Sequence, residues 1–326
     1  MSNEQNKSCC SGGFKTMCGG QALIEGIMMR GPKKQAAVVR RPDGELEIRE
    51  EELKFIKDRY SILGVPLIRG TVNFLDSMVN GVKALMWSAE FFPEDAEQTE
   101  EPSRFEAWLE NKLGSEKISS LIITLAVIMG IGLSIVLFFL LPTLLGGLVA
   151  LVTPSMVVRN VAESLLKIVI FLLYLGLCSR TKDIRRVFQY HGAEHKTIFC
   201  YEAGLPLTVE NVRKQPRHHP RCGTSFLFVV IIVSILVSTV VFSIWPVYNP
   251  LLRFLAHLVM LPLIVGVSYE FNRWCGRNDN ALTRVLTAPG LWMQNFTTFE
   301  PDDSMIEVGI KALELVLPEE KGEDRW

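Results

Sequence analysis

Two histidines and a glutamate in one short segment, His191-Gly192-Ala193-Glu194-His195, are the residues of this chain best suited to chemistry. In a helix, His191 and His195 lie on one face, four residues apart, with Glu194 beside them. Two imidazoles at this spacing can bind one metal ion, and an adjacent carboxylate can deprotonate a water that the ion polarises. The order His-x-x-Glu-His is also that of the inverted zincin motif. The segment therefore predicts a metal site with Glu194 as its base; interfacial polar residues at a membrane boundary are the alternative.

The helix that would carry this motif runs from about residue 181 to 203, with Gly204 and Pro206 as its stop signal. Glu202 falls on the same stripe of this helix as the two histidines. It lies about 11 Å of helical rise beyond His195. That distance is too large for a shared ion, so we interpret Glu202 as a supporting or substrate-binding group.

Further metal ligands must come from elsewhere in the chain, because two imidazoles are too few. The first choice is the loop segment that contains His218, His219 and Cys222, whose nitrogen and sulfur donors suit zinc. A basic interfacial anchor is the alternative interpretation of this segment. Glu270, where the chain leaves a later apolar segment, is the second choice; an exposed charge at a helix end is its alternative.

The elements that position these residues are predicted to cross a membrane. Hydrophobic residues make up 48% of the 326 residues, and the mean hydropathy of +0.24 is high for a soluble protein. An apolar slab of about 30 Å needs some 20 helical residues, fewer where the bilayer thins. We predict a mainly α-helical, polytopic protein with about four transmembrane helices, at residues 118–141, 161–178, 224–245 and 254–269.

Two charged residues and one histidine fall within the predicted spans. Glu163 and Lys167 form an i,i+4 pair of opposite charge, and His257 lies inside the last span. Between the first two spans, residues 142–158 are apolar but interrupted by prolines and glycines. Because such breaks leave backbone groups unpaired in lipid, we expect this stretch to be interfacial or re-entrant.

The charge distribution predicts the orientation. Residues 179–223 hold nine Lys or Arg, whereas the linkers on the other side hold almost none. Basic loops stay in the cytoplasm, so we expect a multi-pass protein of the cell membrane with both termini cytoplasmic. Residues 1–15 are polar and do not resemble a signal peptide. The seven cysteines then lie on or near a reducing compartment, which argues against disulfides.

The rest of the chain divides into cytoplasmic regions around the membrane pairs. A tail is expected to be disordered, and it includes Cys18. A β-hairpin is predicted at 36–50 around Pro42-Asp43-Gly44. Two amphipathic helices are predicted, one of about five turns after Pro66 and one at 305–317. A short helix is expected at 104–113. The predicted regions are 1–18 (tail), 19–113 (N-terminal region), 114–178 (first membrane pair), 179–223 (His/Cys-rich basic segment), 224–269 (second membrane pair) and 270–326 (C-terminal region).

Four segments together resemble the YqhQ-like family of bacterial membrane proteins: 20–32 (GQALIEGIMMRGP), 190–196 (YHGAEHK), 219–225 (HPRCGTS) and 288–300 (APGLWMQNFTTFE). The resemblance covers nearly the whole chain after about residue 18. The family is a domain of unknown function that carries the label of a predicted metal-dependent enzyme. Position by position, the resemblance indicates His191, Glu194, His195, His219 and Cys222, and it adds Glu25, Arg30, Gln294 and Glu300 without assigned roles.

Three classes of function fit these observations. The first is a membrane-bound metal-dependent hydrolase with a zinc ion at the cytoplasmic surface. The second is a small transporter or channel, although four spans without a repeat are few for one. The third is a non-catalytic scaffold that docks a cytoplasmic partner. The net charge of −1 gives no reason to expect nucleic-acid binding. The lipid bilayer is the expected partner. A homo-oligomer or a cytoplasmic protein partner is a further alternative.

Overall fold

The computed structural model describes residues 14–53, 61–92, 125, 128–278, 280–320 and 322–325. The chain forms two compact units, whose boundaries fall inside three long helices. The first unit comprises Met1–Phe92, Tyr174–Ser234 and Pro262–Trp326, and the second comprises Pro93–Leu173 and Ile235–Leu261. The described residues are mainly helical and contain one small antiparallel sheet, as the sequence predicts.

The sheet belongs to the first unit and has the order β1-β2-β3-β4. Its strands are β1 (Gly19–Leu23), β2 (Gly26–Arg30), β3 (Lys34–Arg40) and β4 (Leu46–Glu52). The β3–β4 pair is the predicted hairpin, and Gly44 takes the positive φ of 89° that its turn requires. The sequence did not predict β1 and β2.

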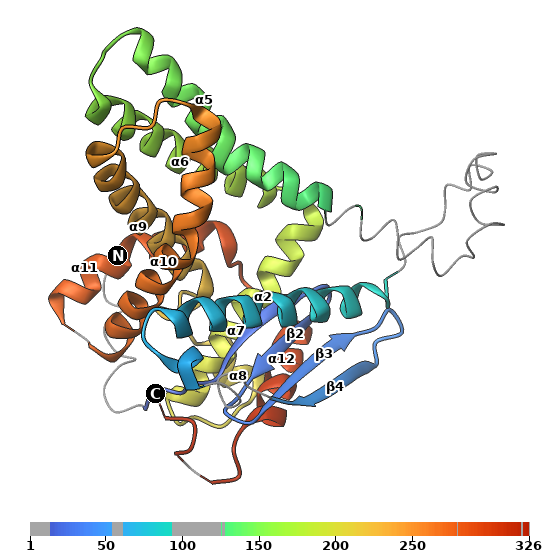
Figure 1. The fold of residues 1–326 in the computed structure, drawn as a ribbon. Helices are drawn as coiled ribbons and strands as arrows, with labels where there is room; N and C mark the ends of the chain where they lie inside the picture. The colour runs from blue at the N-terminus through green and yellow to red at the C-terminus, as the bar shows by residue number, and fades with distance from the viewer. Residues whose placement is uncertain are drawn as a thin grey trace, which may run out of the picture. The chain divides into compact units, whose positions relative to one another are not determined.

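Both faces of the sheet are covered, which explains why β2 escaped prediction. Ile27 and Met29 enter one core, against helices α7 (Lys182–Glu202) and α12 (Asp303–Val316). Met28 enters a second core, which includes Ala84 of helix α2 (Ile68–Ala89). Figure 1 shows α2 and α12 beside the strands. A strand buried on both faces reads as a continuous apolar run without a period of two.

The predicted cytoplasmic helices are present. Helix α7 begins after Thr181 and ends at Ala203, where Gly204 takes a φ of 68°, so the expected limits of the motif helix are confirmed. Helices α2 and α12 confirm the two predicted amphipathic helices. The short helices η1 (Ser61–Gly64) and α8 (Val209–Arg213) lie in the connections. The helix expected at 104–113 lies outside the described residues.

Among the described residues, four helices are long and apolar enough to cross a membrane: Ile128–Leu148, Val157–Cys178, Gly223–Ile244 and Pro250–Arg277. The last three correspond to α6 (Met156–Cys178), α9 (Gly223–Ile244) and α10 (Pro250–Arg277), and α11 (Ala281–Thr297) follows. The number of spans agrees with the prediction, and these helices make the chain a membrane protein. The first span ends later than predicted, and the last one is longer.

The structure differs from the sequence prediction at 142–158. The first span continues through π-helix η2 (Val136–Leu140) and α5 (Leu141–Leu148), and η3 (Val149–Leu151) ends it. Pro142 does not end the span: it follows directly on the π-helix, and such a local change of helix type accommodates a residue without a backbone N–H. The turn between spans is therefore short and ends where α6 begins.

The end of the expected disordered tail is also ordered. The Thr16 hydroxyl donates to Asp324 at 2.5 Å, and Cys18 is buried in the core beneath the sheet. A thiol that packs as a small apolar group gives no spacing pattern in the sequence. Residues 1–13 lie outside the described part of the chain.

Candidate metal centre

Helix α7 and the residue just before α9 bring together the candidate ligands His191, His195 and Cys222. One ring nitrogen of each histidine and the Cys222 Sγ lie within 4.8 Å of one another, and this cluster could hold a metal ion. His191 Nε2 is 3.1 Å from the sulfur, and the two imidazole centroids are 4.4 Å apart. Tetrahedral zinc with nitrogen and sulfur ligands separates its donors by about 3.5 Å. The cluster is thus close to the required spacing.

Both histidines are oriented by backbone carbonyl groups. The Nδ1–H of His191 donates to the Thr297 carbonyl oxygen at 2.8 Å, and that of His195 donates to the Arg217 carbonyl oxygen at 2.5 Å. A carbonyl oxygen only accepts, so each ring carries a proton on Nδ1, and Nε2 is the nitrogen that remains for a metal ion. This arrangement is typical of metal-binding histidines.

Two buried polar atoms at this site have no hydrogen-bond partner among the described residues. One is His195 Nε2, and the other is Glu194 Oε2. His195 is 1% exposed and Glu194 is 5% exposed, so bulk water does not satisfy them. Buried polar atoms are nearly always bonded, and an unpartnered one calls for an ion or a water. The donor set and these two atoms together fit a bound cation.

Glu194 is held by the first strand of the sheet. Its Oε1 accepts the backbone N–H of Gly20 at 3.0 Å. A Cβ at Gly20 would lie 3.0 Å from the Glu194 carboxyl carbon and 2.7 Å from the Met28 carbonyl oxygen, so only glycine fits there. Burial raises the pKa of Glu194, and the charges of His191 and His195 oppose that rise.

Gly192 allows the segment 297–299 to pack closely against α7, beside His191. A Cβ at this position would lie only 2.0 Å from the Phe299 carbonyl oxygen. The Phe299 backbone N–H donates to the Phe188 carbonyl oxygen at 2.9 Å, which fixes the segment beside α7. Thr297, two residues earlier, can therefore reach the imidazole of His191.

Gln294 of α11 forms hydrogen bonds to the segment that contains Cys222, and its side chain is fully buried. The Gln294 amide oxygen accepts the His219 backbone N–H at 2.8 Å. Its amide nitrogen donates to the His219 carbonyl oxygen at 2.8 Å and to the Ser225 hydroxyl at 2.9 Å. Gln294 therefore acts on the position of Cys222 through the backbone of His219 on one side and the side chain of Ser225 on the other.

The sulfur and the imidazoles stabilise each other's charged forms. Burial disfavours the Cys222 thiolate, but the neighbouring His191 and His195 outweigh burial and lower the pKa of Cys222 well below its ordinary value. Burial likewise opposes the charged form of His191, yet Cys222 and Glu194 raise its pKa to about 9. A thiolate is the form of cysteine that binds metals.

His219, which the sequence put among the ligands, lies next to this cluster but is not part of it. Its ring centroid is 5.6 Å from that of His195, and its Nε2 is 3.7 Å from a Glu202 carboxylate oxygen. Burial lowers its pKa to about 4, and the charges of His195 and Arg221 add to that shift. Glu202 itself forms an ion pair with Arg221. Glu202 thus contacts His219 and Arg221, two turns along α7 from His195.

Glu25 and Arg30 are bound to other partners in the first unit. The Arg186 guanidinium pairs with Glu25, which also accepts the Tyr190 hydroxyl at 3.1 Å. Arg30 donates to Asp76 at 2.7 Å. Glu25 therefore supports the helix turn just before His191, whereas Arg30 ties the sheet to α2.

Three further candidates also lie outside the donor cluster. Glu270 forms a two-pronged ion pair with Arg69 of α2, at 2.6 and 2.5 Å. Glu300 pairs with Lys196 at 2.8 Å. His218 is half-buried, and its Nε2 has no hydrogen-bond partner in the described part of the chain. Glu270 is therefore engaged as a structural charge.

Sequence reasoning missed the groups that orient the ligands. Gly20 and Thr297 act through their backbone atoms, as does the carbonyl of Arg217, and a backbone contact leaves no residue-type signal. Gly20 and Thr297 could have been noticed from the sequence, because they lie within the family-like segments 20–32 and 288–300.

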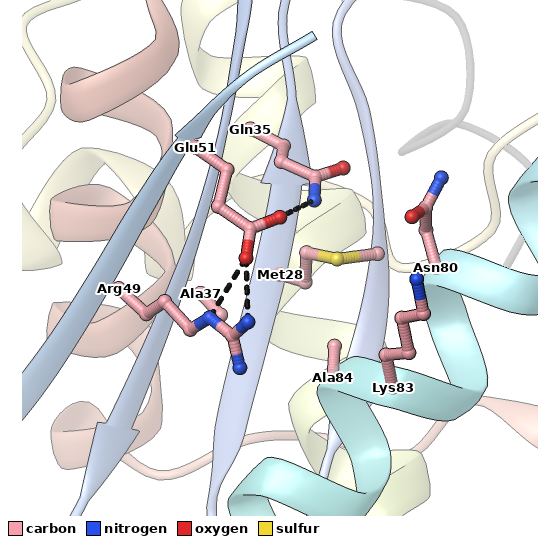
Figure 2. Close-up of a pocket in the computed structure, with 8 residues that line it drawn as sticks. All are labelled: Met28, Gln35, Ala37, Arg49, Glu51, Asn80, Lys83 and Ala84. Carbon is pink, nitrogen blue, oxygen red and sulfur yellow. Dashed lines mark hydrogen bonds and ion pairs between the residues drawn. The ribbon is translucent and has the colours of Figure 1, made fainter. Parts of the chain in front are cut away.

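A separate small pocket lies between the sheet and α2 (Figure 2). Glu51 there accepts from Gln35 at 2.7 Å and from Arg49 at 2.8 Å. Lys83 and Asn80 of α2 line its other side. None of the metal-cluster residues lines this pocket.

These features define a class: a polytopic membrane protein with a His/His/Cys cluster beside a buried carboxylate. The chain belongs to the family described as Protein of unknown function (DUF1385), whose model matches residues 65–319. It is 35% identical over 303 residues to the "Uncharacterized protein YqhQ" of Bacillus subtilis (strain 168), across 92% of each chain. The resemblance to the YqhQ-like family is thereby confirmed. No solved structure matches the chain.

Proposed function

We propose that this protein is a membrane-bound metal-dependent hydrolase, with one zinc ion held by His191, His195 and Cys222. The observation that supports it most is the pairing of three convergent donors with an adjacent carboxylate oxygen, Glu194 Oε2, that has no partner among the described residues. Three protein ligands leave a fourth position open, which is the arrangement of catalytic rather than structural zinc.

A bound zinc ion would act as a Lewis acid that makes a water molecule acidic enough to react near neutral pH. The chain supplies the base. Glu194 is anchored through Oε1 to the Gly20 N–H, which leaves Oε2 to accept a proton. Burial keeps bulk water away from this carboxylate, so a proton it accepts can pass to the leaving group.

The site lies at a membrane surface by chain order. Helix α7 follows the span that ends at Cys178, and Cys222 immediately precedes the span that begins at Gly223. The basic residues of the 179–223 segment support a cytoplasmic location. We therefore propose a substrate that is reached from the cytoplasmic membrane surface.

The test separates ligand from base. Glu194→Gln keeps the size of the side chain and its bond from Gly20 but removes the proton acceptor. We expect purified Glu194→Gln to retain its metal while a deletion strain is no longer complemented. His195→Ala should lose both properties. His218→Ala is the matched control, because this neighbouring histidine lies outside the donor cluster, and it should keep metal. Full complementation by Glu194→Gln would remove the hydrolase mechanism, even if metal is bound.

A further inference from the structure

The second unit buries three cationic side chains around one carboxylate. Arg253 is 1% exposed, Arg159 is 3% exposed, and the Lys167 side chain is 12% exposed. The carboxylate is that of Glu163, also 1% exposed. All four residues lie in α6 or α10, which are candidate membrane spans. Buried charge inside a membrane is costly unless it is paired, so the excess of cations calls for a partner.

Glu163 carries one negative charge and is bonded to only two of the three cations. Its Oε1 accepts the Thr143 hydroxyl at 3.0 Å and lies 3.1 Å from Lys167 Nζ. Its Oε2 accepts from Arg253 Nε at 2.8 Å. The carboxylate therefore serves Lys167 and one edge of Arg253, and none of its bonds reaches Arg159.

His257 is neutral in this cluster and adds no compensating charge. Its Nδ1–H donates to the Arg253 carbonyl oxygen at 2.8 Å, which leaves a lone pair on Nε2. The Lys167 ammonium donates to that Nε2 at 3.0 Å. The Arg253 guanidinium also stacks on the Phe242 ring, with 4.0 Å from its central carbon to the ring centroid. These contacts hold the cations in place without neutralising them.

Three buried N–H donors of this cluster have no partner among the described residues: Arg253 Nη1, Arg159 Nε and Asn160 Nδ2. Arg253 Nη2 donates to the Asn160 side-chain oxygen at 2.6 Å, and Arg159 is the residue next to Asn160 in α6. Asn160 thus has its acceptor engaged and its donors free. The contact from Arg159 Nη2 to the Tyr248 carbonyl oxygen, at 3.5 Å, is at the limit of a hydrogen bond. Only donors are left over, so the missing group is an acceptor.

The position of the donors along the helices also favours an anion. Arg159 and Arg253 are each the fourth residue of their helix, in α6 and α10. A helix N-terminus attracts negative charge through its free N–H groups. Trp245 and Tyr248, in the connection to α10, are 68% and 65% exposed, as aromatic residues at the level of lipid headgroups are. The donors are thus close to the level of lipid phosphates.

We infer that Arg159, Asn160 and Arg253 form a binding site for a phosphate group at the N-terminal ends of α6 and α10. Arginine is the residue best suited to a phosphate, because its planar N–H groups match the oxyanion. The surplus of positive charge matches a group of one to two negative charges. The phosphate of a lipid headgroup and free inorganic phosphate share this chemistry. The inference does not depend on the metal centre.

The experiment measures the thermal stability of the full-length protein with two probes. One probe is inorganic phosphate, titrated against chloride at equal ionic strength. The other is phosphatidylglycerol in mixed micelles, compared with a neutral glycolipid of the same acyl chains. Binding to the folded state raises the melting temperature, and the rise grows with the logarithm of the ratio of ligand concentration to Kd. A response to phosphate identifies a free anion, and a response to phosphatidylglycerol alone identifies a headgroup.

The variants assign the response to these residues. Arg159→Gln should weaken the apparent affinity about tenfold or more, since one charge-assisted hydrogen bond is lost. Arg159→Lys keeps the charge but not the fork, and it serves if the first variant does not fold. Arg180→Gln is the control, because it removes an exposed arginine at the other end of α6. The absence of any response in the wild type, or an unchanged response in both Arg159 variants, overturns the inference.

Discussion

Gly192→Ala tests whether the backbone packed against α7 sets the geometry of the metal ligands. The new methyl group would lie 2.0 Å from the Phe299 carbonyl oxygen, where ordinary contacts begin at 3.4 Å. The segment 297–299 must therefore move by more than an ångström. Because Thr297 orients the imidazole of His191, the movement breaks the 2.8 Å hydrogen bond between them.

The size of the effect follows from two terms. Overpacking of this kind costs about 1–3 kcal/mol, and the lost hydrogen bond adds about 1 kcal/mol. The better helix propensity of alanine offsets at most about 1 kcal/mol. We expect a net loss of about 1–3 kcal/mol in stability. Loss of an orienting group also weakens metal binding by about 10- to 100-fold.

The assay is a chelator competition for zinc, run beside a thermal unfolding scan. Gly176→Ala is the control, because nothing lies within 4 Å of the position of its added methyl group. That variant should match the wild type or exceed it slightly in stability. A Gly192→Ala protein with wild-type zinc affinity and stability would refute the reasoning.

Three further predictions concern pH, topology and a structural ion pair. His219 has a pKa lowered to about 4 by burial, so its neutral form stabilises the fold above its unfolded pKa of about 6.5. That contribution to the free energy of unfolding, on the order of 3 kcal/mol, declines as pH falls from about 6.5 to 4. His219→Gln should make stability less dependent on pH in this range. An unchanged pH dependence in that variant would contradict the assignment. A cysteine introduced at Asn249 should be labelled by a reagent outside intact cells, whereas cysteines in 179–223 should not be labelled. Labelling in 179–223 would show that the topology is the reverse of the predicted one. Glu270→Gln breaks the pair with Arg69 and should lower stability but leave metal content intact, whereas loss of metal would make Glu270 part of the site.

The parts of the fold that the sequence predicted are those with a strong local signal. The helix around His191 combines a helical stripe with a glycine stop at Gly204, and the structure has the same limits. The β3–β4 hairpin was predictable because Pro42-Asp43-Gly44 marks its turn. Pro142 misled the prediction, because a proline beside a π-helical turn is tolerated inside a span and does not end it.

The sequence predicted the residue types of the candidate site, but not which of several neighbouring residues would join the donor cluster. Cys222, His218 and His219 lie within five residues, and spacing alone does not say which of them turns toward His195. The selection is made by tertiary contacts: Gln294 fixes the backbone around Cys222, and Glu202 and Arg221 engage His219. Such contacts join positions far apart in the chain, so a sequence pattern does not encode them.

Elemental analysis of the purified protein tests the central claim most directly. We predict one zinc ion per chain in wild-type protein prepared without chelators, because His191, His195 and Cys222 converge on one point. His195→Ala removes one of three protein ligands, so its zinc content should fall close to zero while His218→Ala stays at the wild-type level. Wild-type protein without a transition metal, or full occupancy in His195→Ala, would contradict the account.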